Sequence, residues 1–206
     1  MSKLILVRHG ESEYNAKSLW TGWHDPMLSP KGRKHAKAIT LAVSDHGVSA
    51  AHTSDLKRAM HTWEIIHDHL SQGQKNIPTI AHHDLKERNY GKFGGKNKWQ
   101  VKQEVGDEVF GQIRRSWDYQ APEGESLKDV YQRSVPYLHN NIMPQINSGE
   151  TVMAVTHGNT NRALIKHLDE IADHDINQIE MPHELIVIYH FENGKSIKKE
   201  EILIQL

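Results

Sequence analysis

The chain has 206 residues, with 25 basic and 26 acidic side chains, a formal net charge of -1 and no cysteine. This length is enough for one α/β domain with a hydrophobic core. The balance of charge argues against binding to nucleic acid or to a membrane surface through net charge, but it leaves room for a local basic pocket. The lack of cysteine rules out disulfides and thiol chemistry and fits a cytoplasmic location.

The first part of the chain alternates predicted strands and helices. Residues 4–7 are apolar and predict a buried strand, which is too short for a signal sequence or a membrane span. A helix is expected from 29 to about 45, because Ser-Pro is typical of a helix start and His-Gly follows it. Residues 48–53 and 78–81 predict weaker strands around a helix over 54–70. The apolar residues on one face of that helix are Leu56, Ala59, Met60, Trp63, Ile66 and Leu70.

The middle of the chain contains its longest irregular stretch. Residues 83–125 are rich in charge, glycine and aromatic side chains, and they predict functional loops or a lid. A long helix is expected to begin at Ser126, because serine followed three positions later by aspartate forms a capping box. Pro136 and Pro144 are expected to interrupt or kink this helix.

The last part of the chain returns to regular alternation. Residues 151–156 predict a buried strand, 159–168 a helix and 185–191 a further strand. Strands that alternate with helices, without a long linker, indicate a single α/β domain over residues 1–206 with a largely parallel sheet.

Two histidines follow predicted strands directly. The motif Arg-His-Gly-Glu-Ser at 8–12 follows the first strand, and His157-Gly158 follows the strand over 151–156. In open α/β sheets, ligands bind at the carboxyl ends of strands. Two such histidines beside an arginine predict a pocket for an anion with a nitrogen nucleophile inside it.

This pocket suits phosphoryl transfer. A neutral ring nitrogen of His9 can attack phosphorus if a partner fixes the proton on the other nitrogen. Arg8 and Arg58 can bind phosphoryl oxygens, and His157 stands at a predicted helix start whose N–H groups favour an anion. Glu87 is the candidate general acid.

Several segments together resemble the cofactor-dependent phosphoglycerate mutases of the histidine phosphatase superfamily, over about residues 3–191. The similar segments are RHGES at 8–12, Asn15, WTGW at 20–23, LSxKG at 28–32, ERxYG at 87–91, GxNK at 95–98, Arg114-Arg115, ESL at 125–127 and HGNxxRAL at 157–164. The resemblance implies an α/β fold with three αβα layers and a mostly parallel central sheet.

The resemblance also implies a role for each matching residue. His9 is then the phosphorylated nucleophile, and Glu87 exchanges a proton with the substrate hydroxyl. The phosphoryl group is then held by Arg8, Arg58 and His157. The implied substrate-binding residues are Asn15, Thr21, Gly22, Tyr90, Lys98, Arg114, Arg115, Gly158 and Asn159.

The implied reaction interconverts 3-phosphoglycerate and 2-phosphoglycerate, in glycolysis and gluconeogenesis. Its priming phosphate donor is 2,3-bisphosphoglycerate, and no metal is required because arginine and histidine supply the positive charge. A small acid with a carboxylate and a phosphate needs several cations around it. Lys98, Arg114 and Arg115 provide a second positive cluster beyond the reacting centre. The expected partners are these small molecules, without nucleic acid or membrane.

Two short segments resemble the short form of these enzymes. Only nine residues separate Arg115 from Glu125, and few follow the predicted strand over 185–191. The expected state is a monomer or homodimer whose site is less shielded from water, so hydrolysis competes with transfer.

Other functions stay open at this point. A phosphatase would use the same His9 chemistry with water as acceptor, and the Lys98, Arg114 and Arg115 cluster argues against it. A phosphate-binding or regulatory module without catalysis would not need both the His9 nucleophile and the Glu87 acid.

Each candidate residue also has an ordinary structural role. His9 could cap or fill the core, and Glu87 could pair with Lys86 or Arg88. Arg58 could be a solvated helix residue, and the 114–115 pair could be exposed.

The remaining histidines do not predict a metal site. His82-His83 and His67-x-His69 have suggestive spacing, but neither comes with a convincing third ligand. Surface histidines are the better interpretation.

Overall fold

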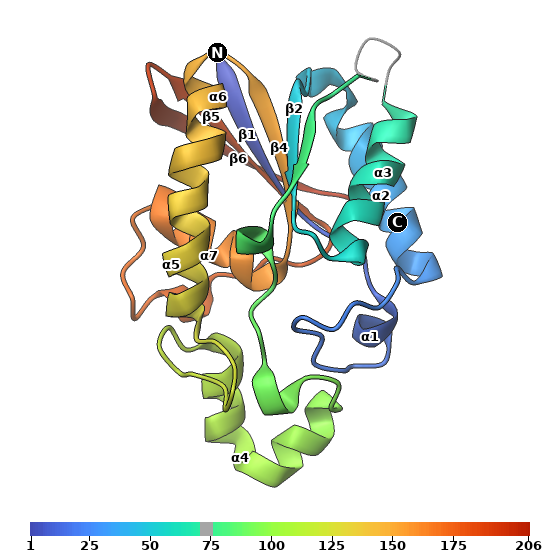
Figure 1. The fold of residues 1–206 in the computed structure, drawn as a ribbon, viewed down its shortest axis with the longest axis vertical. Coiled ribbons are helices and arrows are strands. Elements are labelled where there is room, and N and C mark those ends of the chain that lie inside the picture. Colours follow the sequence, from blue (N-terminus) through green and yellow to red (C-terminus); the bar gives the residue numbers. More distant parts are fainter. Residues whose placement is uncertain (71–75) are drawn as a thin grey trace.

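A six-stranded sheet with helices on both faces organises the chain, in a computed structural model that describes residues 1–70 and 76–206 (Figure 1). The strands are β1 (Ser2–Arg8), β2 (Ala50–Thr53), β3 (Thr79–Ala81), β4 (Thr151–Thr156), β5 (Leu185–Glu192) and β6 (Lys195–Leu203). They lie in the order β3-β2-β4-β1-β5-β6. Pairing is parallel from β3 to β1, whereas β5 runs antiparallel to both β1 and β6. The predicted α/β class and largely parallel sheet are confirmed.

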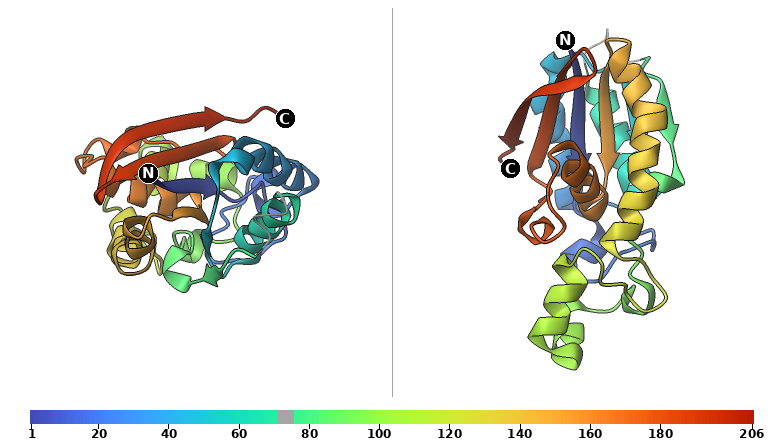
Figure 2. Two further views of the ribbon diagram at one scale, coloured as in Figure 1. Left: turned by 90° about the horizontal axis from the view of Figure 1, so that it is seen from above. Right: turned by 90° about the vertical axis from the view of Figure 1, so that its left-hand side faces the viewer.

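Most helices form two outer layers on the faces of the sheet, and α4 (Lys98–Arg115) lies beyond the sheet (Figure 2). The others are α1 (Glu13–Ala16), α2 (Pro30–Val43), α3 (Lys57–His69), α5 (Leu127–Tyr137), α6 (Met143–Asn147) and α7 (Gly158–Leu168). One face of the sheet is covered by α2 and α3, and the other by α5, α6 and α7. In the described residues, no helix is both long and apolar enough to cross a membrane.

The central strands have no polar face because both faces are covered. Along β1, Leu4 and Leu6 pack into the cluster with α5 to α7, whereas Ile5 and Val7 pack into the cluster with α2 and α3. All four side chains are fully buried. This double burial explains the continuous apolar run in the sequence.

The helix starts predicted at Ser29 and Ser126 are confirmed at atomic detail. The helix predicted from residue 54 begins later, at Lys57, after Leu56, which makes no side-chain cap hydrogen bond. Ser29 accepts a hydrogen bond from the N–H of Gly32 at 3.0 Å, with proline at the first helical position. Gly47 ends this helical region with φ of 67°. Ser126 and Asp129 form the predicted capping box of α5.

The two prolines mark irregular points in one helical path. Pro136 lies inside α5, and the chain continues as a π-helix over Leu138–Ile142 before α6 begins. Pro144 stands in the first turn of α6, where a missing N–H costs no hydrogen bond. The predicted interruption is therefore confirmed as a local change of helix type.

The prediction of an irregular stretch over 83–125 is wrong for its central part. The 18-residue helix α4 lies there, beyond the carboxyl ends of the strands (Figures 1 and 2). Its apolar residues are sparse, and the backbone kinks at Gly106, with φ 79° and ψ 169°. The helix is stabilised by burial of Val101, Phe110 and Ile113 in a separate cluster with Trp20. Strand β6 was not predicted either, because this edge strand is mostly exposed and polar.

Candidate functional site

The carboxyl ends of three adjacent strands bring the two histidines together. His9 follows β1, His157 follows β4, and Ser54 follows β2. Strands β1 and β4 pair in parallel with Arg8 opposite Thr156, so the two histidines leave the sheet side by side. Their ring centroids are 4.9 Å apart.

His9 is held as a neutral imidazole with distinct nitrogens. Nδ1 lies 2.6 Å from the carbonyl oxygen of Gly10, which can only accept, so Nδ1 carries the proton. Nε2 accepts from Nε of Arg58 at 3.3 Å and is the nitrogen with a free electron pair. Burial lowers the pKa of His9 well below its usual value, and the charge of Arg58 adds to the effect. The ring is therefore neutral at neutral pH, with no proton on Nε2.

Arg58 is buried and fixed on three sides. Its Nη1 and Nη2 donate to the carbonyl oxygens of His24 and Gly22, each at 2.8 Å, while Nε donates to His9. The left-handed backbone of Gly22, with φ of 51°, presents its carbonyl. Burial lowers the pKa of Arg58 to about 10, so the guanidinium stays charged at neutral pH. An exposed structural role for Arg58 is excluded.

Two polar atoms beside His9 are buried without a hydrogen-bond partner among the described residues. They are Nε of Arg8 and Nδ1 of His157. Nη1 of Arg8 donates to the carbonyl of Met181 at 2.8 Å, and Nε2 of His157 hydrogen-bonds with Ser54 at 2.6 Å. A buried unpaired donor is costly, so these atoms fit an anion with oxygens between them.

Glu87 has one carboxylate oxygen held by three N–H groups. Oε1 accepts from the backbone N–H of Arg88 at 2.8 Å, and from the backbone N–H and Nδ2 of Asn159, each at 3.1 Å. The expected alternative, pairing with a neighbouring cation, is not observed. The Lys86 ammonium pairs with Asp55 at 3.3 Å, and the Arg88 guanidinium binds backbone carbonyls.

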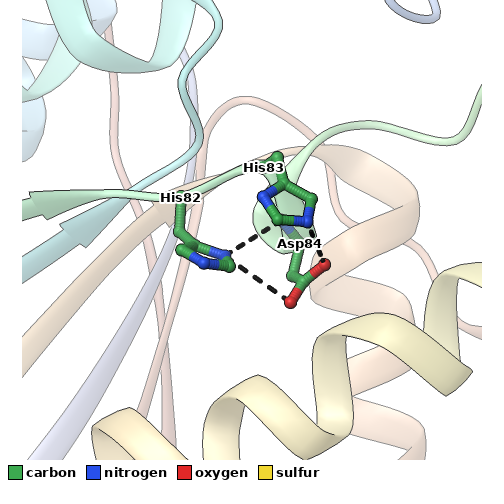
Figure 3. Close-up of side chains that lie close together, drawn as sticks. All are labelled: His82, His83 and Asp84. Atoms are coloured by element: carbon green, nitrogen blue, oxygen red, sulfur yellow. Dashed lines mark hydrogen bonds and ion pairs between the residues drawn. The ribbon is translucent and has the colours of Figure 1, made fainter.

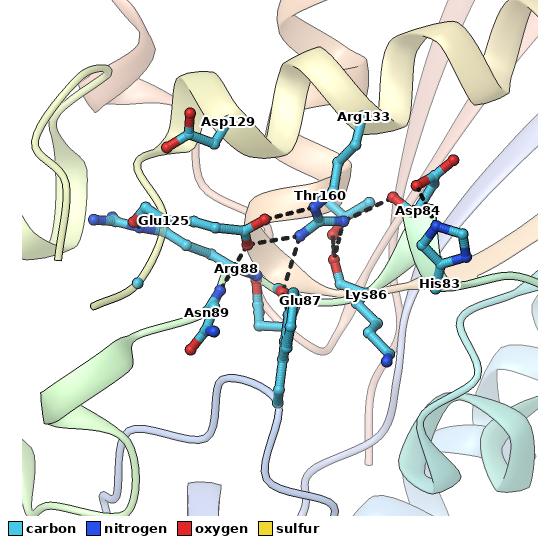
Figure 4. A network of polar contacts seen from close by, with 12 residues as sticks. His83, Asp84, Lys86, Glu87, Arg88, Asn89, Glu125, Asp129, Arg133 and Thr160 are labelled. Atoms are coloured by element: carbon cyan, nitrogen blue, oxygen red, sulfur yellow. Dashed lines mark hydrogen bonds and ion pairs between the residues drawn. The ribbon is translucent and has the colours of Figure 1, made fainter. Parts of the chain in front are cut away.

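A polar network fixes the segment that carries Glu87 (Figure 4). Arg133 on α5 donates to the carbonyls of Asp84, Lys86 and Glu87 at 2.7 to 3.0 Å. It also pairs with Glu125 at 2.9 Å. Sequence reasoning missed Arg133, because nothing local marks an arginine whose partners are backbone carbonyls of another segment.

Two adjoining cavities lie beside these residues, of about 50 and 120 Å³. The smaller is lined by His9, Asn15, Thr21, Gly22 and Arg58. The larger is lined by Arg114, Arg115, Gly158, Asn159, Arg162, Glu180 and Met181. Both are lined by Arg8, Trp20, Glu87, Tyr90 and Lys98. All nine predicted substrate-binding residues line these cavities, whereas His157 lines neither of them.

Helix α4 brings the second group of cations to the larger cavity. Lys98 begins the helix and Arg114 and Arg115 end it, so the kink at Gly106 sets their spacing. Burial lowers the pKa of Lys98 to about 8, with further repulsion from Arg8. A bound anion would favour the charged form of this lysine.

The segment before β5 supplies site residues that the sequence analysis missed. His183 donates from Nδ1 to the carbonyl of His9 at 2.6 Å, and the two rings are 5.3 Å apart. Burial lowers the pKa of His183 well below its usual value, with Arg8 adding to the effect. Glu180 and Met181 line the larger cavity. No local signal marks these residues, since pairing of β5 with β1 places them.

His82, His83 and Asp84 bring three potential metal ligands together (Figure 3), and Asp84 is a third ligand that was not assigned from sequence. The two imidazole rings are stacked, with centroids 4.4 Å apart and planes at 29°. A metal must lie in the plane of each ring that binds it, which stacked rings prevent. Nδ1 of His82 accepts from the N–H of Asp84 at 3.3 Å. We interpret the group as the cap of a short turn over His83–Leu85.

The chain is similar to known proteins over nearly its whole length. A family described as the histidine phosphatase superfamily (branch 1) matches residues 4–201. A 2,3-bisphosphoglycerate-dependent phosphoglycerate mutase from Brucella anthropi is 40% identical over 202 residues, covering 97% of each chain. One from Cytophaga hutchinsonii is 39% identical over 193 residues, covering 94% of this chain and 89% of the relative.

Solved structures share the fold over nearly the whole chain. The YhfR protein of Bacillus stearothermophilus has a TM-score of 0.81 at 26% identity, covering 100% of this chain and 96% of its own. A mycobacterial glucosyl-3-phosphoglycerate phosphatase complexed with VO3 has a TM-score of 0.83 at 22% identity, covering 98% and 97%. The second likeness concerns the fold alone.

Proposed function

The chain belongs to the histidine phosphatase superfamily, and we propose that it is a 2,3-bisphosphoglycerate-dependent phosphoglycerate mutase. It interconverts 3-phosphoglycerate and 2-phosphoglycerate through phosphorylated His9. The observation that carries this proposal is the second cationic cavity, with Lys98, Arg114 and Arg115, which directly adjoins the cavity of the nucleophile. A phosphatase that acts on varied esters and transfers to water has less need of the second cavity.

In the first half-reaction, Nε2 of phosphorylated His9 loses its phosphoryl group to the hydroxyl of a monophosphoglycerate. A new phosphorus–oxygen bond forms as the phosphorus–nitrogen bond breaks, and Glu87 takes the hydroxyl proton. Arg8, Arg58 and His157 stabilise the charge on the equatorial oxygens. The proton stays on Nδ1, which donates to the carbonyl of Gly10, so His9 is released as a neutral imidazole.

In the second half-reaction, the doubly phosphorylated intermediate first reorients within the site, so that its other phosphoryl group faces His9. His9 attacks the other phosphoryl group, and Glu87 returns the proton to the leaving alkoxide. The larger cavity holds the anionic groups that are not reacting, with Tyr90 and Asn159 joined by a 2.9 Å hydrogen bond at its wall. The reaction needs no metal in this scheme, because every developing charge faces a cation of the chain.

The residues present fit 2,3-bisphosphoglycerate as the primer. Two unpaired buried polar atoms, on Arg8 and His157, suit one phosphate beside His9. Lys98 and Arg114 suit the second anionic end. When bound, the compound supplies the phosphoryl group that charges His9.

We propose a single domain over residues 1–206 that acts as a monomer or homodimer. The lack of cysteine and the near-neutral charge support a cytoplasmic place with small-molecule partners only.

The test is phosphorus NMR of the protein with 3-phosphoglycerate, a trace of 2,3-bisphosphoglycerate and a chelator. We expect 2-phosphoglycerate to grow to a steady ratio, with little inorganic phosphate. His9→Ala should lose both turnover and the phosphohistidine signal, and exposed His174→Ala is the matched control. Accumulation of inorganic phosphate would instead assign a phosphatase, and phosphoenzyme retained in His9→Ala would exclude His9 as nucleophile.

A further inference from the structure

One carboxylate in the larger cavity is not used by the reaction. Glu180 lines this cavity together with the cations, and its Oε1 pairs with Nη2 of Arg115. Glu87 is the other carboxylate on the wall, and it faces the proton transfer. A negative charge inside an anion site opposes the binding of its ligand, so Glu180 needs a separate explanation.

The backbone on both sides of Glu180 is held by hydrogen bonds, whereas its side chain is mostly exposed. The carbonyl of Ile179 accepts from Nε of Arg162 at 2.9 Å, and the carbonyl of Met181 accepts from Nη1 of Arg8 at 2.8 Å. The side chain of Glu180 is 60% exposed, and that of Arg115 is 29% exposed. An ion pair this exposed is weak and screened, so another anion can replace it easily.

Arg162, another cation of this cavity, differs from Arg115. Arg162 is buried, and its guanidinium donates to Ile176 and Ile179 carbonyls and to Asn159. All three guanidinium nitrogens of Arg162 are therefore bound to groups of the protein, and no pair of them is left to bind a ligand. Arg115 is instead held by a single carboxylate, which has the same chemistry as a substrate carboxylate or phosphate.

We propose that Glu180 is an internal counter-ion that an anionic group of the substrate replaces on Arg115. The inference rests on the proposed function for the identity of the substrate. In the free protein, Glu180 neutralises Arg115. When phosphoglycerate binds, its acidic end takes the guanidinium and the Glu180 side chain turns to solvent. On product departure Glu180 returns, so the residue weakens binding of both substrate and product.

This exchange makes a distinct kinetic prediction. Glu180→Gln keeps the size of the side chain but removes its charge, so Arg115 is open to substrate at all times. We expect KM for 3-phosphoglycerate to fall about threefold to fivefold, as loss of one exposed ion pair allows. The value of kcat should stay equal or fall, because product leaves more slowly.

The decisive measurement is calorimetric binding of 3-phosphoglycerate to four chains: wild type, Glu180→Gln, Arg115→Ala and the double variant. Glu180→Gln should tighten binding in the wild-type background and have no effect beside Arg115→Ala. Glu192→Gln at the distant end of β5 is the matched control for net charge, and its binding should equal that of wild type.

Three results would overturn the proposal: unchanged affinity in Glu180→Gln, equal tightening in both backgrounds, or equal tightening by Glu192→Gln. Equal tightening in both backgrounds would show that the charge of Glu180 acts through the overall electrostatic field of the cavity and not by exchange on Arg115. Binding does not require turnover, so failure of the mutase assay leaves this test intact. A wild type that binds no 3-phosphoglycerate would overturn the proposed function and the inference together.

Discussion

His9 has different tasks assigned to its two nitrogens by neighbouring contacts. The Gly10 carbonyl keeps the proton on Nδ1, and Arg58 approaches Nε2. Burial and the Arg58 charge keep the pKa low, so the ring is neutral before attack. The same burial would make an unpaired anion costly, and the neighbouring arginines remove that cost once phosphorus is bound.

The substitution Glu87→Gln separates the proposed role of Glu87 in proton transfer from its role in the geometry of the site. The amide oxygen of glutamine can still accept from Arg88 and Asn159, so the geometry is kept, but the side chain cannot exchange a proton. We expect kcat to fall by roughly 10²–10⁴-fold with KM close to normal. Steady-state kinetics measure both, with Glu192→Gln as the charge control. Wild-type kcat in Glu87→Gln would remove this residue from the proton transfer.

At the scale of elements, α4 determines the width of the larger cavity. It carries a cation at each end and buries few apolar side chains between them. Its direction changes at Gly106, whose φ of 79° and ψ of 169° suit only glycine. The kink therefore links a backbone property to the spacing of Lys98 and the arginines.

Two glycines of α4 give a matched pair of substitutions. Gly106→Ala should lower the free energy of unfolding by about 1–3 kcal/mol, because alanine is strained at this φ and ψ. It should also raise KM, since the ends of α4 move relative to each other. Gly111→Ala meets no atom within 4 Å and should raise the free energy by up to about 1 kcal/mol. Urea unfolding and KM measurements check both, and equal effects at the two sites would contradict the role of the kink.

At the scale of the whole molecule, folding buries His9 and His157 in their neutral form. Burial is the largest cause of the low pKa of His9 and of His157, and Arg58 lowers both further. The folded protein therefore binds fewer protons than the unfolded chain, whose histidines titrate near pH 6.5. Stability should rise with pH through this range.

Between pH 7.5 and 5.5 we expect the free energy of unfolding to fall. The loss approaches about 1.4 kcal/mol per pH unit for each buried neutral histidine below pH 6.5. Urea unfolding at several pH values measures this slope. His157→Gln should make it shallower, and exposed His174→Gln is the control. A slope unchanged in His157→Gln would contradict neutral burial of His157.

The local part of this protein was determined by its sequence. Short apolar runs predicted β1 and β4, and the His-Gly that follows each run predicted the two ring positions, since strand ends and caps depend on neighbouring residues. The nine residues that we propose to bind substrate were predicted through a family resemblance, and the cavities they line came only from the folded chain.

Tertiary structure decided what joins distant segments. Helix α4 was missed over 83–125 because its apolar residues are few and pack into a cluster that includes the distant Trp20. His183 reaches the carbonyl of His9, 174 positions away, only because β5 pairs with β1. Glu180 meets Arg115 where the guanidinium of Arg162 donates to the carbonyls of both Ile179 and Arg115. Contacts of this kind depend on how strands and helices pack, and a local pattern of residues carries no record of them.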